Sequence, residues 1–390
     1  MIDFLQKYLS INTALPNPRY DEAIKLFAEQ AILDGFLVKE IVLKDSFKVL
    51  VITALGTEPA LPALLLNHHM DVVPAPDVTS WYQDPFTPLI KDGYIYARGT
   101  QDMKGIGVLH YCALRELKLA GIALKRTVHI ALVPDEECGG YNGAHLFVET
   151  DFFKQMNVGY ALDEGWPSGK DSTLGIKITE RKPIQVLITS KGEMSHGSRL
   201  ACVNASHLLI SFLHELIVGQ AERQNKLAHT PAGLLLSVNI TSLHAGLVVD
   251  GQVTLNVVSD TATATADIRV PPFMSMEAVH QQLQSMMQQY PGITYEVRST
   301  VEERIYEQFV ETSMYRALVE SIEDQGLSVD KIYMEGSTDL RFYQAKGIEG
   351  FGISPFTVEA NLHGINECVS LKDLETGKQL FIAFIKKFCL

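Results

Sequence analysis

The stretch LLLNHHMDVVP, residues 64–74, is the feature that most limits how this chain can fold. Its leucines and valines put apolar side chains on both faces of an extended backbone, which is typical of a strand buried on both sides. His68, His69 and Asp71 interrupt this apolar run. Because side chains alternate along a strand, His69 and Asp71 share one face, while His68 and Met70 share the other. The stretch therefore predicts a core strand whose end opens into a polar site.

The rest of the chain contains two kinds of region, which differ in the polarity pattern of their strands. Apolar strands alternate with helices up to about residue 182 and again from about residue 302, which predicts an α/β fold with a mostly parallel sheet flanked by helices. Between them, strands of alternating polarity bracket two helices, at 204–224 and 276–290, which indicates a smaller antiparallel α+β domain. We therefore predict a discontinuous domain, 1–182 with 302–390, and an inserted domain, 183–301.

Composition excludes several classes of function. The chain of 390 residues is 46% hydrophobic and 20% charged, which is ordinary for globular domains, and its length favours two of them. A net charge of −13 argues against a nucleic-acid partner and means that an anionic substrate needs locally placed cations. No apolar run is long enough to predict a membrane span. The five scattered cysteines, without a CxxC pair, favour free thiols and a cytoplasmic location.

Acidic residues and histidines recur where apolar strands meet Gly, Pro or a turn. Sites in open α/β sheets form at the carboxyl ends of strands, so we expect these groups to converge. Four carboxylates in one pocket would repel each other unless a cation neutralised them. Two histidines with three carboxylates suit zinc or a similar metal, and two metals sharing a carboxylate would leave one acid as proton carrier. The five positions are His69-Met-Asp71, Asp102, Glu136-Glu137, Asp163-Glu164 and His363.

Nine tracts carry a resemblance to a known family: LLLNHHMDVVP, WYQDPF, GYIYARGTQDMKG, VPDEECGG, ALDEG, SHGSR, NVVSDTATATADIRV, STDLR and LHGINE. Over nearly its whole length the sequence resembles the two-zinc metallopeptidases that include aminoacylases, related carboxypeptidases and dipeptidases. The tracts PDEE-x-GG, ARG-x-QDMK and ALDEG look most like those of the aminoacylases, which are N-acyl-L-amino-acid amidohydrolases. The resemblance implies a zinc-exopeptidase-like catalytic domain, an inserted lid or dimerisation domain, and a homodimer.

The resemblance also implies a set of metal ligands. Two zinc ions per subunit are expected, with cobalt or manganese as possible substitutes. His69 and Glu164 would ligate one ion, His363 and Glu137 the other, and Asp102 both. A cis peptide bond directly after Asp102 is a further feature implied by the family.

Catalytic and substrate-binding roles follow from the same resemblance. Glu136 would be the general base that takes a proton from a metal-activated water and delivers it to the leaving amine. Asp71 would accept the second ring N–H of His69. His196, in the inserted domain, would steady the oxyanion in a neighbouring subunit, although a plain turn residue is the alternative. Three residues would hold the substrate carboxylate, with a structural salt bridge as the alternative for the arginines and a turn cap for the asparagine: Asn256, Arg269 and Arg341.

The expected activity is hydrolysis of N-acyl-L-amino acids to a carboxylate and a free amino acid. A dipeptidase or carboxypeptidase of the same fold is an open alternative, because each cleaves an amide next to a carboxylate. A non-catalytic binding protein is a third alternative. The presence of Glu136 together with all five ligand residues argues against it, because loss of the base is the easiest way to silence such a site.

Overall fold

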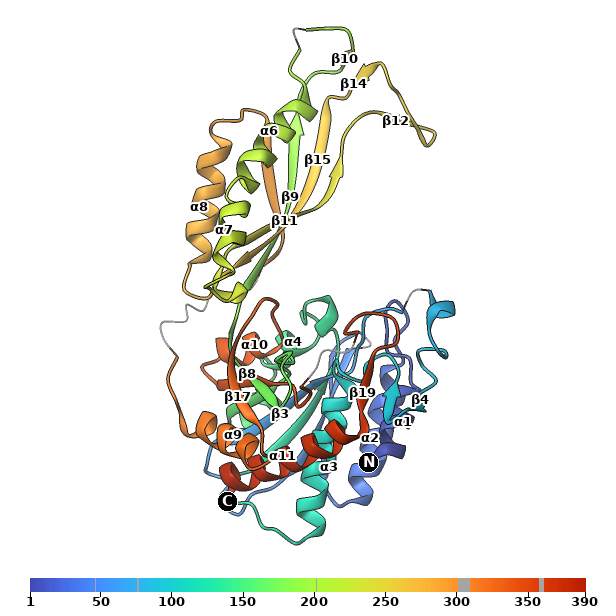
Figure 1. Ribbon diagram of the computed structural model, residues 1–390, viewed down its shortest axis with the longest axis vertical. Helices are drawn as coiled ribbons and strands as arrows, with labels where there is room; N and C mark the ends of the chain where they lie inside the picture. The colour runs from blue at the N-terminus through green and yellow to red at the C-terminus, as the bar shows by residue number, and fades with distance from the viewer. Residues whose placement is uncertain (46, 76, 201, 301–308, 358–360) are drawn as a thin grey trace. The chain divides into compact units, whose positions relative to one another are not determined.

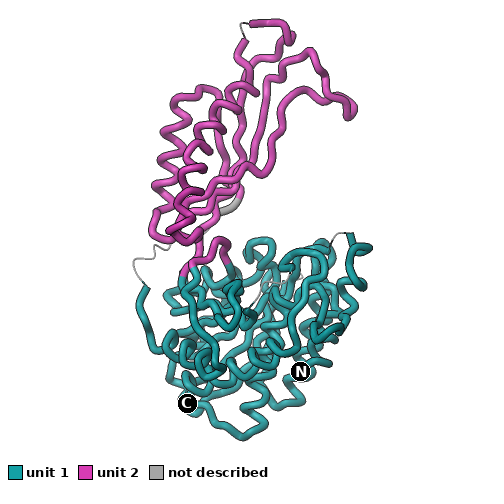
Figure 2. The backbone as a smooth tube through the Cα atoms, viewed as in Figure 1, with its two compact units in different colours: residues 1–178, 309–332, 338–390 teal, residues 179–308, 333–337 magenta. Residues whose placement is uncertain are grey.

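A computed structural model describes residues 1–390 except 46, 76, 201, 301–308 and 358–360. The chain forms two compact units, which Figure 2 distinguishes by colour. The boundary between Ile178 and Thr179 lies close to the expected one at 182–183, while the expected return at 301–302 falls outside the described residues. The first unit comprises Met1–Ile178, Phe309–Ile332 and Thr338–Leu390, and the second comprises Thr179–Gln308 and Tyr333–Ser337.

The first unit is built on one large sheet flanked by helices (Figure 1). Its eight strands have the order β1-β2-β6-β3-β7-β18-β8-β17. The four central strands, β6, β3, β7 and β18, are parallel to one another, and β6 and β18 pair on their outer sides with the antiparallel strands β2 and β8. The strands are β1 Leu37–Lys44, β2 Phe47–Ala54, β3 Ala63–His69, β6 Val128–Val133, β7 Val158–Asp163, β8 Thr173–Glu180, β17 Ser328–Met334 and β18 Glu349–Ile353. A separate small sheet contains β4 Leu89–Lys91, β5 Tyr94–Tyr96 and β19 Cys368–Ser370.

Helices cover both faces of this sheet, which explains why every residue of β3 is buried. Leu65 and its neighbours on one face pack against short helices that carry Phe147, Phe153 and Tyr343. His68 on the opposite face meets Phe27 and Tyr8. The helices of the first face are α4 Ala144–Phe147, α5 Asp151–Gln155 and α10 Leu340–Ala345. The others are α1 Ile2–Leu9, α2 Tyr20–Leu33, α3 Lys104–Leu119, α9 Ser313–Glu323 and α11 Leu371–Cys389.

The second unit is a four-stranded antiparallel sheet of order β11-β15-β9-β16 with helices on one face. Burial alternates strictly along β15, as its polarity pattern predicts, so one face of the sheet is buried and the other is open. Its strands are β9 Lys182–Lys191, β11 Ser237–His244, β15 Thr261–Val270 and β16 Ile293–Thr300. Short ladders pair β10 Ser195–His196 with β14 Val257–Val258, and β12 Val248–Val249 with β13 Gln252–Val253.

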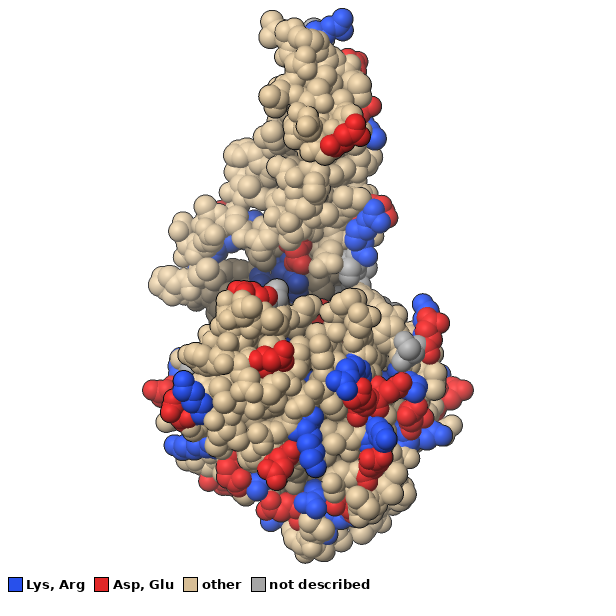
Figure 3. Space-filling model, turned by 90° about the vertical axis from the view of Figure 1, so that its right-hand side faces the viewer, with Lys and Arg blue, Asp and Glu red and all other residues tan. Residues whose placement is uncertain are grey.

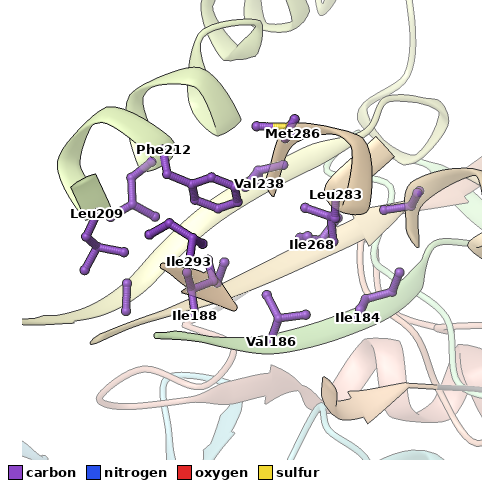
Figure 4. Packing of buried hydrophobic residues seen from close by; sticks show 14 of the residues in the cluster. Ile184, Val186, Ile188, Leu209, Phe212, Val238, Ile268, Leu283, Met286 and Ile293 are labelled. Carbon is purple, nitrogen blue, oxygen red and sulfur yellow. The ribbon is translucent and has the colours of Figure 1, made fainter. Parts of the chain in front are cut away.

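The core of the second unit forms between the sheet and its helices. Side chains such as Val186 and Ile268 from the sheet meet Phe212 and Leu283 from the helices (Figure 4). The helices are α6 Ala205–Ile217, α7 Gln220–Lys226 and α8 Met276–Met287. The single helix expected at 204–224 is therefore two, because the chain breaks at Val218 and Gly219, where glycine favours helix poorly. The predicted fold class, an α/β unit with a separate antiparallel α+β unit, is confirmed.

Three further features concern membrane spans, cysteines and surface charge. No helix among the described residues is long and apolar enough to span a membrane. All five cysteines are free thiols. On the face shown in Figure 3, acidic and basic side chains are interspersed over the first unit, whereas the second unit shows wide areas without charged side chains.

Candidate metal centre

Four segments carry polar side chains to one edge of the large sheet. The parallel strands β3, β6, β7 and β18 all end at this edge. His69 is the last residue of β3, and Glu164 directly follows β7. Glu136 and Glu137 lie in the 3-10 turn η2 (Glu136–Cys138) after β6, and His363 lies in the segment after β18. Residues far apart in the sequence therefore meet at one site, as the strand-end argument predicts.

The first group of donor atoms consists of His69, Asp102 and Glu164, whose ligand atoms all lie within 4.8 Å of one another. His69 Nε2 lies 2.9 Å from Asp102 Oδ1 and 3.5 Å from Glu164 Oε1. Asp102 precedes α3, and the peptide bond that follows it is cis, as the resemblance implied. Around a tetrahedral zinc ion with bonds of about 2.0 Å, donor atoms lie roughly 3.3 Å apart, so this spacing fits such an ion.

The second group uses the other oxygen of the same aspartate. His363 Nε2 lies 3.0 Å from Asp102 Oδ2 and 3.5 Å from Glu137 Oε1. The three donor atoms again lie within 4.8 Å of one another. The two oxygens of Asp102 thus face two different histidines, an arrangement suited to a carboxylate shared between two ions.

Proton affinities in this pocket reflect crowded carboxylates. Burial raises the pKa of Glu164 to about 8, and the nearby charge of Asp102 adds to this effect. Hydrogen bonds with Asp102 and Glu137 raise the pKa of His363 to about 10. Burial disfavours the charged form of His69, but the carboxylates of Glu164 and Asp102 outweigh it and raise its pKa. A divalent cation would replace these protons, since metal ligands bind in their deprotonated forms.

Asp71 organises the site in a way that differs from the expectation. The Nδ1 of His69 lies 3.0 Å from the backbone carbonyl oxygen of Asp71 and 3.7 Å from its carboxylate. The carboxylate instead accepts the backbone N–H groups of Glu136 at 3.2 Å and Glu137 at 2.9 Å. The carbonyl therefore orients the imidazole and leaves Nε2 facing the site, while the carboxylate fixes the turn that carries both glutamates.

Glu136 belongs to neither group of donor atoms. Burial raises its pKa well above the usual range, and the charge of Glu164 adds to this effect. A half-buried carboxyl group with a high proton affinity, beside two candidate metal positions, has the properties of a proton carrier.

Comparison with known proteins shows the family to which the chain belongs. The model of peptidase family M20/M25/M40 matches residues 65–387. The chain belongs to this family. Aminoacylase-1 of Mus musculus is 35% identical to this M20 chain over 373 residues, which cover 94% of the chain and 90% of that protein. Aminoacylase-1 of Homo sapiens is 34% identical over 363 residues, covering 91% and 86% respectively.

Solved structures agree on the fold of the M20 chain. An M20 family metallo-carboxypeptidase, Sso-CP2 from Sulfolobus solfataricus, superposes with a TM-score of 0.79 at 18% identity, covering 99% of this chain and 98% of that one. Human carnosine dipeptidase 1 gives a TM-score of 0.70 at 17% identity, covering 99% and 96%. At these identities the likeness concerns the fold alone.

His68 lies on the opposite face of β3 from the candidate metal positions of this M20 enzyme. Its Nε2 is 2.9 Å from the hydroxyl oxygen of Tyr8, and its ring packs against Phe27. A Cβ atom on Gly107 of α3 would lie 2.4 Å from the His68 ring, so this glycine lets the helix approach closely. His68 is thus a core residue.

Replacing the two adjacent histidines is expected to separate metal binding from stability. His69→Ala should lose the metal of the first group, because it removes a nitrogen donor. His68→Ala should keep both metals but lower the free energy of unfolding by about 2–4 kcal/mol, through the cavity and the unpaired Tyr8 hydroxyl. Metal content after dialysis and denaturant unfolding measure the two effects. Equal metal contents in the two variants would contradict the assignment.

The second unit of the M20 chain carries three of the predicted residues, two of which lie close together. His196, in β10, is exposed, and its Nδ1 lies 2.8 Å from Ser198 Oγ and accepts the Ser198 backbone N–H at 3.2 Å. Asn256 is exposed, and its carbonyl accepts the backbone N–H of Gly197 at 2.7 Å. Pairing of β10 with β14 thus brings these two positions together.

Both predicted arginines make structural contacts. In the second unit, Arg269 forms a two-point pair with Asp267 of the same strand, with Nε–Oδ1 and Nη2–Oδ2 distances of 2.6 and 3.1 Å. In the first unit, Arg341 donates to the backbone carbonyls of Thr338 at 2.6 Å and Gly139 at 2.7 Å. Gly139 directly follows η2, so Arg341 supports the turn that carries Glu136.

Sequence reasoning assigned no role to two supporting networks. Behind Glu164, Tyr343 donates to Asn67 Oδ1 at 2.7 Å, and Asn67 donates to Asp163 Oδ1 at 2.9 Å. Asn67 lies two residues before His69 in β3, so strand periodicity could have predicted that the two side chains share one face. The second network joins Arg98 to Glu367, and no local pattern links residues so distant in sequence.

Proposed function

We propose that this M20 chain hydrolyses the amide bond of N-acyl-L-amino acids, using two zinc ions, to give a carboxylate and a free amino acid. The observation that carries the proposal is the position of Asp102 between His69 and His363, with one oxygen facing each. The aminoacylase-1 relatives, at about one third identity over most of the chain, support this choice among M20 activities.

The residues present fit a metal pair. His69 and Glu164 would hold one ion, His363 and Glu137 the other, and Asp102 would contribute an oxygen to each. Zinc suits this mixture of imidazole and carboxylate donors, and cobalt or manganese are plausible substitutes on the same grounds. When bound, such a pair polarises a carbonyl oxygen and makes water more acidic.

Glu136 is the proposed proton carrier. Its carboxylate takes a proton from the attacking water and then donates that proton to the nitrogen of the departing amino acid. The turn that holds it is fixed from two sides, by the Asp71 carboxylate and by Arg341. A base that is already held in place needs no reorganisation during the reaction, which favours rapid proton transfer.

His196 is the proposed donor to the oxyanion. Because the backbone N–H of Ser198 can only donate, Nδ1 of His196 is the acceptor and a neutral ring carries its proton on Nε2. That N–H can donate to a developing negative oxygen. We propose that it does so in a partner subunit, as the family resemblance implies, so that the working unit is a homodimer.

Exposed apolar side chains in the second unit support the dimer. Leu200 and Leu255 are almost fully exposed, at 104% and 95% relative to a reference residue. Exposed apolar side chains mark an interaction surface where they form a contiguous patch. Further exposed apolar residues of this unit include Met194, Val203, Val248, Val249 and Val253.

The α-carboxylate of the substrate needs positive charge in a chain of net charge −13. We propose Arg269, Arg341 and Asn256 for this role, since a guanidinium matches a carboxylate in two-point geometry. Arg269 would exchange part of its contact with Asp267 for the substrate, and Arg341 would act from the end of the Glu136 turn.

A hydrolysis panel tests the function directly. N-acetyl-L-methionine and other N-acyl-L-amino acids are compared with dipeptides of the same residues, after loading with zinc, cobalt or manganese. We expect kcat/KM for the acyl amino acids to exceed that for the dipeptides by at least about tenfold, because a free substrate amino group would need its own acidic partner. The reverse ranking would make the chain a dipeptidase or carboxypeptidase, and no turnover on either class would favour a binding protein.

A further inference from the structure

Glu367 is a fully buried carboxylate four residues after His363. Its Oε2 accepts Nη1 of the equally buried Arg98 at 2.7 Å and the backbone N–H of Gly99 at 3.1 Å. Arg98 also donates from Nη2 to the backbone carbonyl of His363 at 3.1 Å. One guanidinium thus ties Glu367 and His363 to the segment that leads into Asp102.

The second oxygen of Glu367 contacts the same segment further along. Oε1 accepts the backbone N–H of Gln101 at 2.8 Å and of Asp102 at 3.4 Å, and the hydroxyl of Thr100 at 3.3 Å. Together the two oxygens accept from five donors within residues 98–102. Such a carboxylate fixes the backbone of the segment immediately before the Asp102 side chain.

The backbone of His363 also needs support. Its φ angle is 58°, in the left-handed region that residues other than glycine rarely adopt. A residue in such a conformation persists only where its surroundings hold it there. The bond from Arg98 to the His363 carbonyl is a restraint of this kind.

We propose that Glu367 and Arg98 are positioning residues that set the geometry between Asp102 and His363, and thereby the affinity of the second metal position. The inference rests on the proposed metal pair and extends it to residues that touch neither ion. A buried ion pair adds little net stability compared with apolar side chains, but it fixes the groups that it joins. Loss of a hydrogen-bonding partner behind a metal ligand typically weakens metal binding about 10–100-fold.

The test measures stepwise metal binding to metal-free protein by competition with a chromophoric chelator. His363→Ala identifies the binding step that belongs to the second position. Glu367→Gln keeps the size of the side chain but removes its charge, and we expect it to weaken that same step by about 10–100-fold with much less effect on the other step. Arg98→Lys keeps the positive charge but loses the fork, and should weaken the same step.

Asp34→Asn is the matched control. Asp34 is a buried carboxylate that pairs with Arg115 at 2.7 Å, and Arg115 lies in α3 about 16 Å along the helix from Lys104. This variant should lower the melting temperature without changing either binding step.

The proposal is overturned if Glu367→Gln and Arg98→Lys bind both ions like the wild type, or if they weaken both steps equally and Asp34→Asn does the same. If the wild type itself binds fewer than two ions, that measurement alone refutes the metal pair of the proposed function, independently of the variants. If Glu367→Gln does not fold, Arg98→Lys decides the question.

Discussion

Glu136→Gln should lower kcat by about 10²–10⁴-fold while leaving both metals bound. Glutamine has nearly the same shape but cannot take a proton from water or return it to the leaving nitrogen. Neither group of donor atoms includes Glu136, so the metal positions should stay intact. Measuring kcat on N-acetyl-L-methionine, together with metal content after dialysis, checks both parts of the result.

The neighbouring glutamate supplies the contrast. Glu137 lies in the second group of donor atoms, 3.5 Å from His363 Nε2, so Glu137→Gln should lose metal as well as activity. The Asp71 carboxylate accepts the backbone N–H groups of both residues. The two variants should therefore disturb the structure of the turn to a similar extent. Wild-type turnover in Glu136→Gln, or loss of metal from it, would refute its role as a proton carrier.

Asp102→Asn should remove both metals and with them all detectable hydrolysis. The two oxygens of Asp102 lie 2.9 Å from His69 Nε2 and 3.0 Å from His363 Nε2, so one neutral amide replaces a charged donor in both groups. His363→Ala should instead affect one position only. Metal analysis after dialysis against low zinc distinguishes the two results.

Thermal unfolding provides an independent measure of the same variant. A ligand present at 100 times its dissociation constant stabilises a protein by about 2.7 kcal/mol, so zinc should raise the melting temperature of the wild type but not of Asp102→Asn. Glu375→Gln, which changes an exposed acid of α11, is the control and should respond to zinc like the wild type. A zinc-dependent shift of wild-type size in Asp102→Asn would rule out the shared carboxylate.

Much of the fold was readable from local patterns. The apolar run of residues 64–69 is a fully buried strand, and the strict alternation of residues 261–270 is a strand with one open face. Side-chain periodicity reports how many faces of a strand are covered, and this is a local property. The helix break at Val218 and Gly219 escaped prediction, because a single glycine lowers helix propensity by only about 1 kcal/mol and need not end a helix.

The sequence by itself determined the chemical inventory of this protein. It specified two histidines and four carboxylates at strand ends, the separation of His68 from His69 by strand periodicity, and the family to which the chain belongs. Each of these depends on residue type and short-range spacing. Such features are encoded locally and need no knowledge of distant contacts.

Only the tertiary structure decided which atoms meet. In the folded chain, the backbone carbonyl of Asp71, and not its carboxylate, contacts His69 Nδ1. Arg269 pairs with Asp267, and Glu367 pairs with Arg98. These contacts depend on rotamers and on segments up to 269 positions apart that are brought together when the sheet and its loops assemble. A linear sequence specifies the available donors and acceptors, whereas their pairing is fixed by competition among all of them within the folded chain.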